Sequence, residues 1–211
     1  MATPYISYER LKGFIPYGFD SVGFDLYAPF ATNEDAIFGI LRDYCVRSVT
    51  IADTDPDAIQ RLQVMSKHGA SLLKELAAIE HEAAHANDME AFYNSLQAFL
   101  TNGEKRTDER EVAVKMFLSH FSVDGNPMSE FSPGKTLPFY DCGQMEERIG
   151  LLDEVCAYIT CADFSTVEPR EPKDALFFIQ RPDDMPMPDK IRLSEYKSRI
   201  EKSGATIIHY Y

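Results

Sequence analysis

A helical pattern that runs from Asp55 to Gly103 limits what this chain can fold into more than any other feature. Asp55 followed by Pro56 is typical of a helix start, because a short acceptor side chain caps the first turn and proline needs no partner there. Apolar residues then recur at spacings of three and four, the period of one helix face: Leu62, Met65, Gly69, Leu72, Leu76, Ile79 and Ala83. We therefore predict one long helix at the centre of the fold.

A second apolar stripe begins part-way along this stretch and consists of Met89, Phe92, Leu96 and Phe99. Counting back from it at the same spacing reaches His85 and His81, so we expect both histidines to be at least partly buried. Asn87 followed three residues later by Glu90 is a capping-box pattern, which favours a break or kink near Asn87. The alternative is one unbroken helix that is buried on both sides where the stripes overlap.

His81-Glu82-Ala83-Ala84-His85 is the one motif in the sequence with a defined chemistry. On a helix this spacing places two imidazoles on one face, within reach of a single Zn²⁺, and the glutamate can act as general base on the metal-bound water. Over these five residues the chain resembles the zincin metallopeptidases. The resemblance implies a zinc-dependent hydrolase with His81 and His85 as metal ligands and Glu82 as the catalytic base.

Such a zinc site also needs a third protein ligand, which the sequence does not identify. The extended form of the motif would have Gly at position 88 and His at position 91, where this chain has Asp88 and Ala91. For a glutamate ligand the candidates are Glu104, Glu109 and Glu111, and His120 is a further candidate. Glu82 and His85 also have the spacing found in di-iron carboxylate proteins, but no second pair of this kind accompanies them. We therefore prefer an interpretation without a cofactor, with zinc as the alternative.

The charge balance limits the kind of partner. The formal net charge is −13 and no Lys/Arg cluster occurs, which argues against direct binding to nucleic acid phosphates. The negative charge permits a basic protein partner. We expect the partner to be another protein, and a homo-oligomer is also compatible with the sequence.

Compartment and redox state follow from what the sequence lacks. No apolar run is long enough to span a bilayer, and Met1 to Phe14 has neither the basic start nor the apolar core of a signal peptide. We therefore expect a cytoplasmic protein that does not bind membranes. Without CxxC spacing, we expect the four cysteines to be reduced and mostly buried: Cys45, Cys142, Cys156 and Cys161.

Shorter elements flank the long helical stretch. We predict strands at Val22–Tyr27, Ser48–Ala52, 175–179 and 205–211, and further helices at 33–45, 107–121, 146–160 and 189–202. The last strand, helix and strand suggest a βαβ unit. The predicted fold is α+β, a mainly helical body built on the long helix, with a small sheet from the N- and C-terminal segments. The predicted domains are residues 1–166, with an aromatic-rich N-terminal arm, and a unit at 167–211 packed on the same core.

Asp53, Thr54 and Asp55 follow the predicted strand Ser48–Ala52. Acidic residues after a buried strand can hold Mg²⁺, as in haloacid dehalogenase-like phosphatases, but that family's threonine and lysine motifs cannot be placed here. We interpret the segment as a turn and helix N-cap. The complete pattern favours an acidic soluble protein that binds another macromolecule, as a structural component or an inhibitor or adaptor, through an apolar patch of aromatics from the first 32 residues. The alternative is the zinc-dependent hydrolase.

Overall fold

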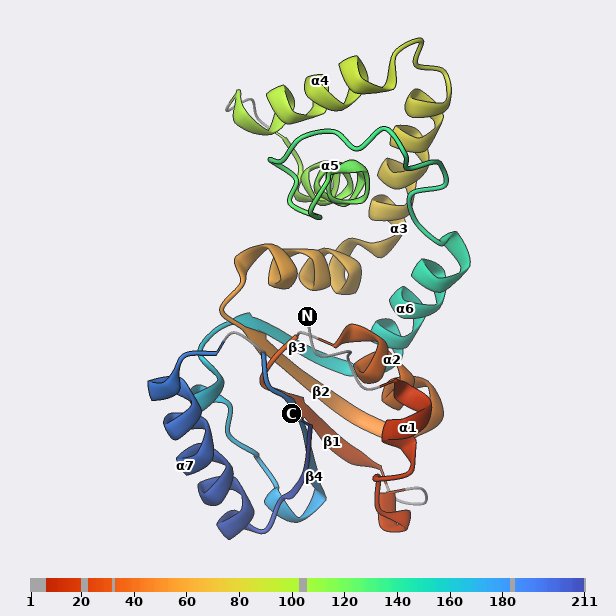
Figure 1. Cartoon of the computed structure of the whole chain (residues 1–211). Coiled ribbons are helices and arrows are strands. Elements are labelled where there is room, and N and C mark those ends of the chain that lie inside the picture. Colours follow the sequence, from red (N-terminus) through yellow and green to blue (C-terminus); the bar gives the residue numbers. More distant parts are fainter. Residues whose placement is uncertain (1–6, 20–22, 32, 103–105, 183–184, 211) are drawn as a thin grey trace. The chain divides into compact units, whose positions relative to one another are not determined.

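The computed structural model describes residues 7–19, 23–31, 33–102, 106–182 and 185–210, and it shows an α/β fold with a parallel sheet (Figure 1). The strands lie in the order β3-β2-β1-β4-β5, and all neighbouring strands are parallel: β1 Phe24–Ala28, β2 Val46–Asp53, β3 Cys156–Cys161, β4 Ala175–Gln180 and β5 Thr206–Tyr210. The predicted α+β fold is therefore wrong. The sheet takes strands from well inside the chain as well as from its ends, and no single long helix dominates.

The chain divides into two compact units. The sheet unit comprises Met1–Ile59 and Leu151–Tyr211, and the helical unit comprises Gln60–Gly150. In the sequence, the helical unit lies between β2 and β3. The α-helices of the described residues are α1 Tyr8–Lys12, α2 Glu34–Asp43, α3 Pro56–Ala84, α4 Met89–Thr101, α5 Asp108–Phe121, α6 Cys142–Glu154 and α7 Met187–Ser203. Short 3₁₀ turns lie at Tyr17–Phe19, Phe164–Thr166 and Pro172–Asp174.

The sheet is covered by helices on both faces. Side chains alternate along each strand, so Tyr27 and Phe177 reach one face, where they belong to the same buried cluster as Tyr196 of α7. Figure 1 shows α7 on this side of the sheet and α1 and α2 on the other. The segment β1-α2-β2 runs from the centre towards one edge, and β4-α7-β5 runs towards the other. This arrangement is the doubly wound α/β architecture.

Local sequence signals in the sheet unit are confirmed. The side chain of Asn33 accepts a hydrogen bond from the Ala36 amide at 3.1 Å and so caps α2. The predicted strand at Val22–Tyr27 is observed as β1, with Val22 itself outside the described residues. The predicted C-terminal βαβ unit is present as β4, α7 and β5, and its two strands pair in parallel. Strands β4 and β5 therefore belong to the same sheet as β1 and β2.

The segment that we predicted to be helical at 146–160 changes to a strand before its end. Helix α6 stops at Glu154, and Cys156–Cys161 forms the edge strand β3, paired with β2. The apolar residues Leu152, Val155 and Ile159 fit a helical period, but Tyr158-Ile159-Thr160 is a β-branched and aromatic run. The predicted fold does not contain this strand, so the predicted sheet has fewer strands than the observed one.

The stretch at Asp55–Gly103 is broken, as the capping pattern indicated. Helix α3 ends at Ala84 and α4 begins at Met89, with the side chain of Asp88, not Asn87, accepting from the Ala91 amide at 3.0 Å. A further kink lies within α3 at His68, where φ is −137° and ψ is 28°. The first apolar stripe is buried at Leu72, Leu76, Ile79 and Ala83. Gly103, where the helical pattern of the sequence ends, lies outside the described residues.

Two surface expectations are wrong. The N-terminal aromatics are mostly core residues, since Tyr8, Phe24, Tyr27 and Phe30 are buried and only Phe14 among the large described ones is markedly exposed, at 60%. The four cysteines are free thiols, as expected, but all of them are exposed rather than buried. Among the described residues, no helix has the length and apolar character needed to cross a membrane.

Candidate ligand-binding crevice

A crevice of about 360 Å³ lies in the sheet unit, at the edge where the parallel strands end. Its lining comes from the segments that follow four strands: Pro29 and Phe30 after β1, Asp53 and Thr54 at the end of β2, Ala162, Asp163 and Phe164 after β3, and Pro182, Met185, Pro186, Asp189 and Arg192 after β4. The strand order reverses between β1 and β4, where chain connections lead in opposite directions. In open α/β sheets, ligands bind in the crevice beside this switch point.

Asp53 holds the loops of the crevice together. Its carboxylate accepts hydrogen bonds from the amides of Ala31, at 2.8 Å, and of Asp55, at 3.0 Å. Its carbonyl oxygen accepts from the Ala162 amide at 2.9 Å. One residue therefore fixes the chain after β1, β2 and β3. The predicted turn is present, because the carboxylate of Asp55 in turn accepts from the Asp57 amide at 2.9 Å in the first turn of α3.

Arg192 on α7 bridges two carboxylates at the rim. Its guanidinium donates to Asp163 and to Asp189, each at 2.9 Å. Hydrogen bonds and ion pairing with these two carboxylates raise the pKa of Arg192. Burial raises the pKa of Asp163, but hydrogen bonds from Ser165 and Arg192 outweigh this and hold it below the ordinary value. Asp163 is therefore charged at neutral pH and has a fixed orientation.

An aromatic wall closes one side of the crevice. The rings of Phe30 and Phe164 lie 5.3 Å apart between centroids and are inclined by 34°. The Arg192 guanidinium lies 5.3 Å from the centroid of the Phe164 ring, within the range of a cation–π contact. Met185 adds a further apolar side chain. The crevice thus combines aromatic and other apolar side chains with charged groups in defined positions.

The charges in the lining are predominantly negative. Asp53, Asp163 and Asp189 face a single guanidinium, that of Arg192. A carboxylate can accept about four hydrogen bonds, so each of these groups retains acceptor capacity beyond the contacts described above. At the centre of the sheet, β1 leads into Pro29 and Phe30, which carry neither a nucleophile nor a metal-binding oxygen in their side chains. The chemistry that this lining provides is recognition of a cation or hydrogen-bond donor.

The histidine motif lies in the helical unit, and both of its histidines are exposed. The two imidazole rings lie 4.2 Å apart between centroids, and Nδ1 of His85 lies 2.8 Å from the carbonyl oxygen of His81. Glu82 accepts a hydrogen bond from Arg110 at 3.1 Å. The expectation of partly buried histidines is wrong because the chain breaks between α3 and α4, so the stripe of α4 cannot be extended back to them.

Within the described part of the chain, no third ligand joins these histidines, and Glu104 lies outside the described residues. Glu109 pairs with His68 at 3.4 Å, and Glu111 pairs with Arg106 and Lys115, each at 2.6 Å. Nε2 of His120 lies 3.1 Å from the carbonyl oxygen of Thr136. Among the residues that the structure describes, no group of three or more His, Cys, Asp or Glu side chains is placed to hold a metal ion.

The sequence reasoning missed Asp163, Asp189 and Arg192 as candidate site residues. Asp163 follows β3, but the sequence before it predicts a helix at 146–160, which does not place Asp163 at the end of a parallel strand. A usable signal was present in Asp53 and Asp163, which are polar residues at or just after strands of β-branched composition.

No protein-family model matches this sequence, and comparison with curated proteins finds no match. Its function is therefore inferred from the geometry of the crevice.

Proposed function

We propose that this protein binds a small molecule in the crevice at the carboxyl edge of its sheet. The observation that carries the proposal is the position of the crevice at the switch point between β1 and β4, lined from the ends of four strands. Its volume, about 360 Å³, lies within the usual range for small-molecule sites. The macromolecular partner expected from the sequence stays a prediction, and the burial of most N-terminal aromatics removes one of its reasons.

The lining indicates the chemical class of the ligand. An apolar ring would pack against Phe30 and Phe164, while a cationic or hydrogen-bond-donating group would be accepted by Asp53 or Asp189. The excess of carboxylates over guanidinium favours a positively charged ligand over an anion. Because Asp53 and Asp163 are already held by hydrogen bonds to their own loops, the ligand meets acceptors in fixed positions, which lowers the entropic cost of binding.

Thermal unfolding in the presence of small aromatic amines, nucleosides and aliphatic amines tests the proposal directly. A member of this panel that carries both a ring and a cationic group is expected to raise Tm in a saturable manner. In Asp189→Asn the same compound should bind about tenfold more weakly, because a charge-assisted hydrogen bond is lost. Glu154→Gln removes one negative charge from an exposed residue of α6, outside the lining, and serves as the matched control.

Two results would refute the proposal. One is that no compound of the panel shifts Tm at millimolar concentration. The other is that Glu154→Gln weakens binding as much as Asp189→Asn, which would show that the response follows the net charge of the protein and not the crevice.

A further inference from the structure

Arg192 of α7 places a guanidinium in the lining of the crevice at the carboxyl edge of the sheet. Two different nitrogens of this side chain donate hydrogen bonds, Nη1 to Asp189 and Nη2 to Asp163, each at 2.9 Å. The same group lies 5.3 Å from the centroid of the Phe164 ring. The crevice therefore already holds one planar cation, which belongs to the chain itself and is bound by two carboxylates and an aromatic ring.

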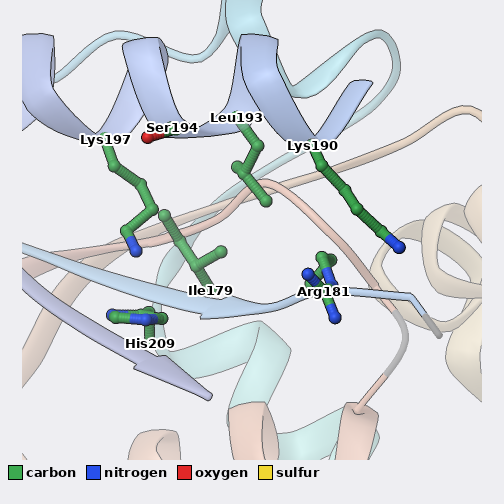
Figure 2. Close-up of a pocket in the computed structure, with 7 residues that line it drawn as sticks. All are labelled: Ile179, Arg181, Lys190, Leu193, Ser194, Lys197 and His209. Carbon is green, nitrogen blue, oxygen red and sulfur yellow. The ribbon is translucent and has the colours of Figure 1, made fainter. Parts of the chain in front are cut away.

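The backbone of Arg192 is fixed, but its side chain is not enclosed. The next residue, Leu193, is buried and points from α7 towards Ile179 of β4 (Figure 2). Tyr196, one turn further along, is also buried, and its hydroxyl donates to the carbonyl oxygen of Val167 at 2.6 Å. The side chain of Arg192, in contrast, is 48% exposed. The guanidinium can therefore leave the carboxylates by rotation of side-chain torsions, without any movement of the helix.

The contacts that hold this guanidinium are weak enough to be exchanged. All three side chains of the ion pairs are partly exposed, so water screens the attraction between Arg192 and the two carboxylates. Asp163 keeps its orientation without the arginine, because the amide and the hydroxyl of Ser165 both donate to its carboxylate. A ligand that brings an equivalent cation therefore finds an acceptor that stays in place.

From this geometry we propose that the ligand of the crevice carries a guanidinium or amidinium group, and that Arg192 occupies the subsite for this group until the ligand binds. The inference rests on the proposed small-molecule function and adds the chemical class of the cation. A planar group with two terminal nitrogens reproduces both hydrogen bonds of Arg192, whereas an ammonium is a point charge without this fork. The apolar part of the ligand lies beside Phe30 and Met185, which also line the crevice.

Competition by Arg192 has a measurable consequence for affinity. When only a fraction of the protein is competent to bind, the apparent Kd rises by the inverse of that fraction. If the guanidinium of Arg192 occupies the subsite about 90% of the time, its removal should tighten the binding of a suitable ligand about tenfold. If Arg192 only stabilised the surrounding loops, its removal would weaken binding instead. The sign of the change therefore separates the two roles.

Isothermal titration calorimetry of the full-length protein with phenylguanidine and with benzylamine tests the competition. In Arg192→Ala the Kd for phenylguanidine should fall about tenfold relative to the unmodified protein. Benzylamine has the same charge and also carries a phenyl ring, but it has no fork, so its Kd should fall less. Arg199→Ala is the matched control, because Arg199 lies on the same helix, pairs with Glu168 at 2.6 Å and is outside the lining. Both Kd values should stay unchanged in this control.

The inference is overturned if phenylguanidine binds Arg192→Ala no more tightly than the unmodified protein. It is also overturned if benzylamine gains as much, or if Arg199→Ala gives the same increase, since either result would show a response to net charge alone. If neither compound binds while another compound of the panel does, the cation class is wrong and the small-molecule function stands. If Arg192→Ala does not fold by circular dichroism, Arg192→Gln replaces it, with the same expected change.

Discussion

Gly39 and Gly150 both lie inside helices, but only Gly150 has space for a side chain. A methyl group on Gly39 in α2 would overlap the ring of Tyr8 from α1, whereas on Gly150 in α6 it would meet no heavy atom of the described residues within 4 Å. We therefore expect Gly39→Ala to destabilise the protein by about 1–3 kcal/mol, the usual cost of overpacking. Gly150→Ala should stabilise it by about 0.5–1 kcal/mol, through helix propensity.

Urea unfolding of the two glycine variants measures both effects with the same substitution. Equal changes in the free energy of unfolding would contradict the close packing of Tyr8 on Gly39. Helix α1 has only five residues, and its buried side chains are Tyr8 and Leu11.

The ion pair between Asp43 and Lys12 leads us to expect that the protein loses stability in acid. The amine of Lys12 donates to the Asp43 carboxylate at 2.6 Å, and this hydrogen bond is the main reason why the pKa of Asp43 falls to about 2. A lowered pKa in the folded state stabilises the protein above the unfolded value of about 4, and the contribution is lost as the pH falls from about 4 to about 2. Since Lys12 is 48% exposed, we expect a contribution of only about 1 kcal/mol.

The check is the free energy of unfolding of Asp43→Asn and of the unmodified protein between pH 6 and pH 2. The variant should be less stable at pH 6, and the difference should disappear towards pH 2. Asp153→Asn, an exposed acid in the last turn of α6, is the control and should not show this dependence. A difference for Asp43→Asn that is constant across the pH range would exclude the ion pair as its cause.

At the scale of single elements, the histidine motif lies where helix α3 ends. The helix stops at Ala84, so His85 lies beyond its last residue, although it stays close to His81. We expect protein purified without an affinity tag to contain less than about 0.1 zinc per chain, since a structural or catalytic zinc needs at least three protein ligands. Elemental analysis measures this directly. About one zinc per chain, lost in His81→Ala, would restore the hydrolase interpretation.

Elements with a complete local signal were predictable from the sequence. The cap of α2 at Asn33 and the break before α4 depend on residues within one turn of each other. Strand β3 had only part of such a signal, the β-branched and aromatic run at 158–160, because it lies at the edge of the sheet and its side chains are exposed or only partly buried. Without β3, Asp163 could not be placed beside Asp53, so the crevice was not predictable. It exists only because parallel strands bring distant residues to one edge.

On the scale of the whole molecule, the pairing of β2 with β3 spans the complete helical unit. Each residue of β2 from Ser48 to Asp53 pairs with one that is 108 positions later, from Cys156 to Cys161 of β3. Within the helical unit, Gly69 of α3 lies directly against Ile149 of α6. The two helices that connect this unit to the sheet therefore meet each other inside it.

That meeting of α3 and α6 affects the order in which the chain can fold. If the contact between Gly69 and Ile149 forms first, the loop to be closed before β3 joins β2 shortens from 108 residues to about 28, which reduces the entropic cost of closure by about 1 kcal/mol. During synthesis, β1 and β2 leave the ribosome long before β3, β4 and β5. The edge of β1 that pairs with β4 therefore stays unpaired until β4 has been synthesised. If the helical unit folds early, it brings the segments before and after it together, and β3 can then pair with β2 across a shorter loop.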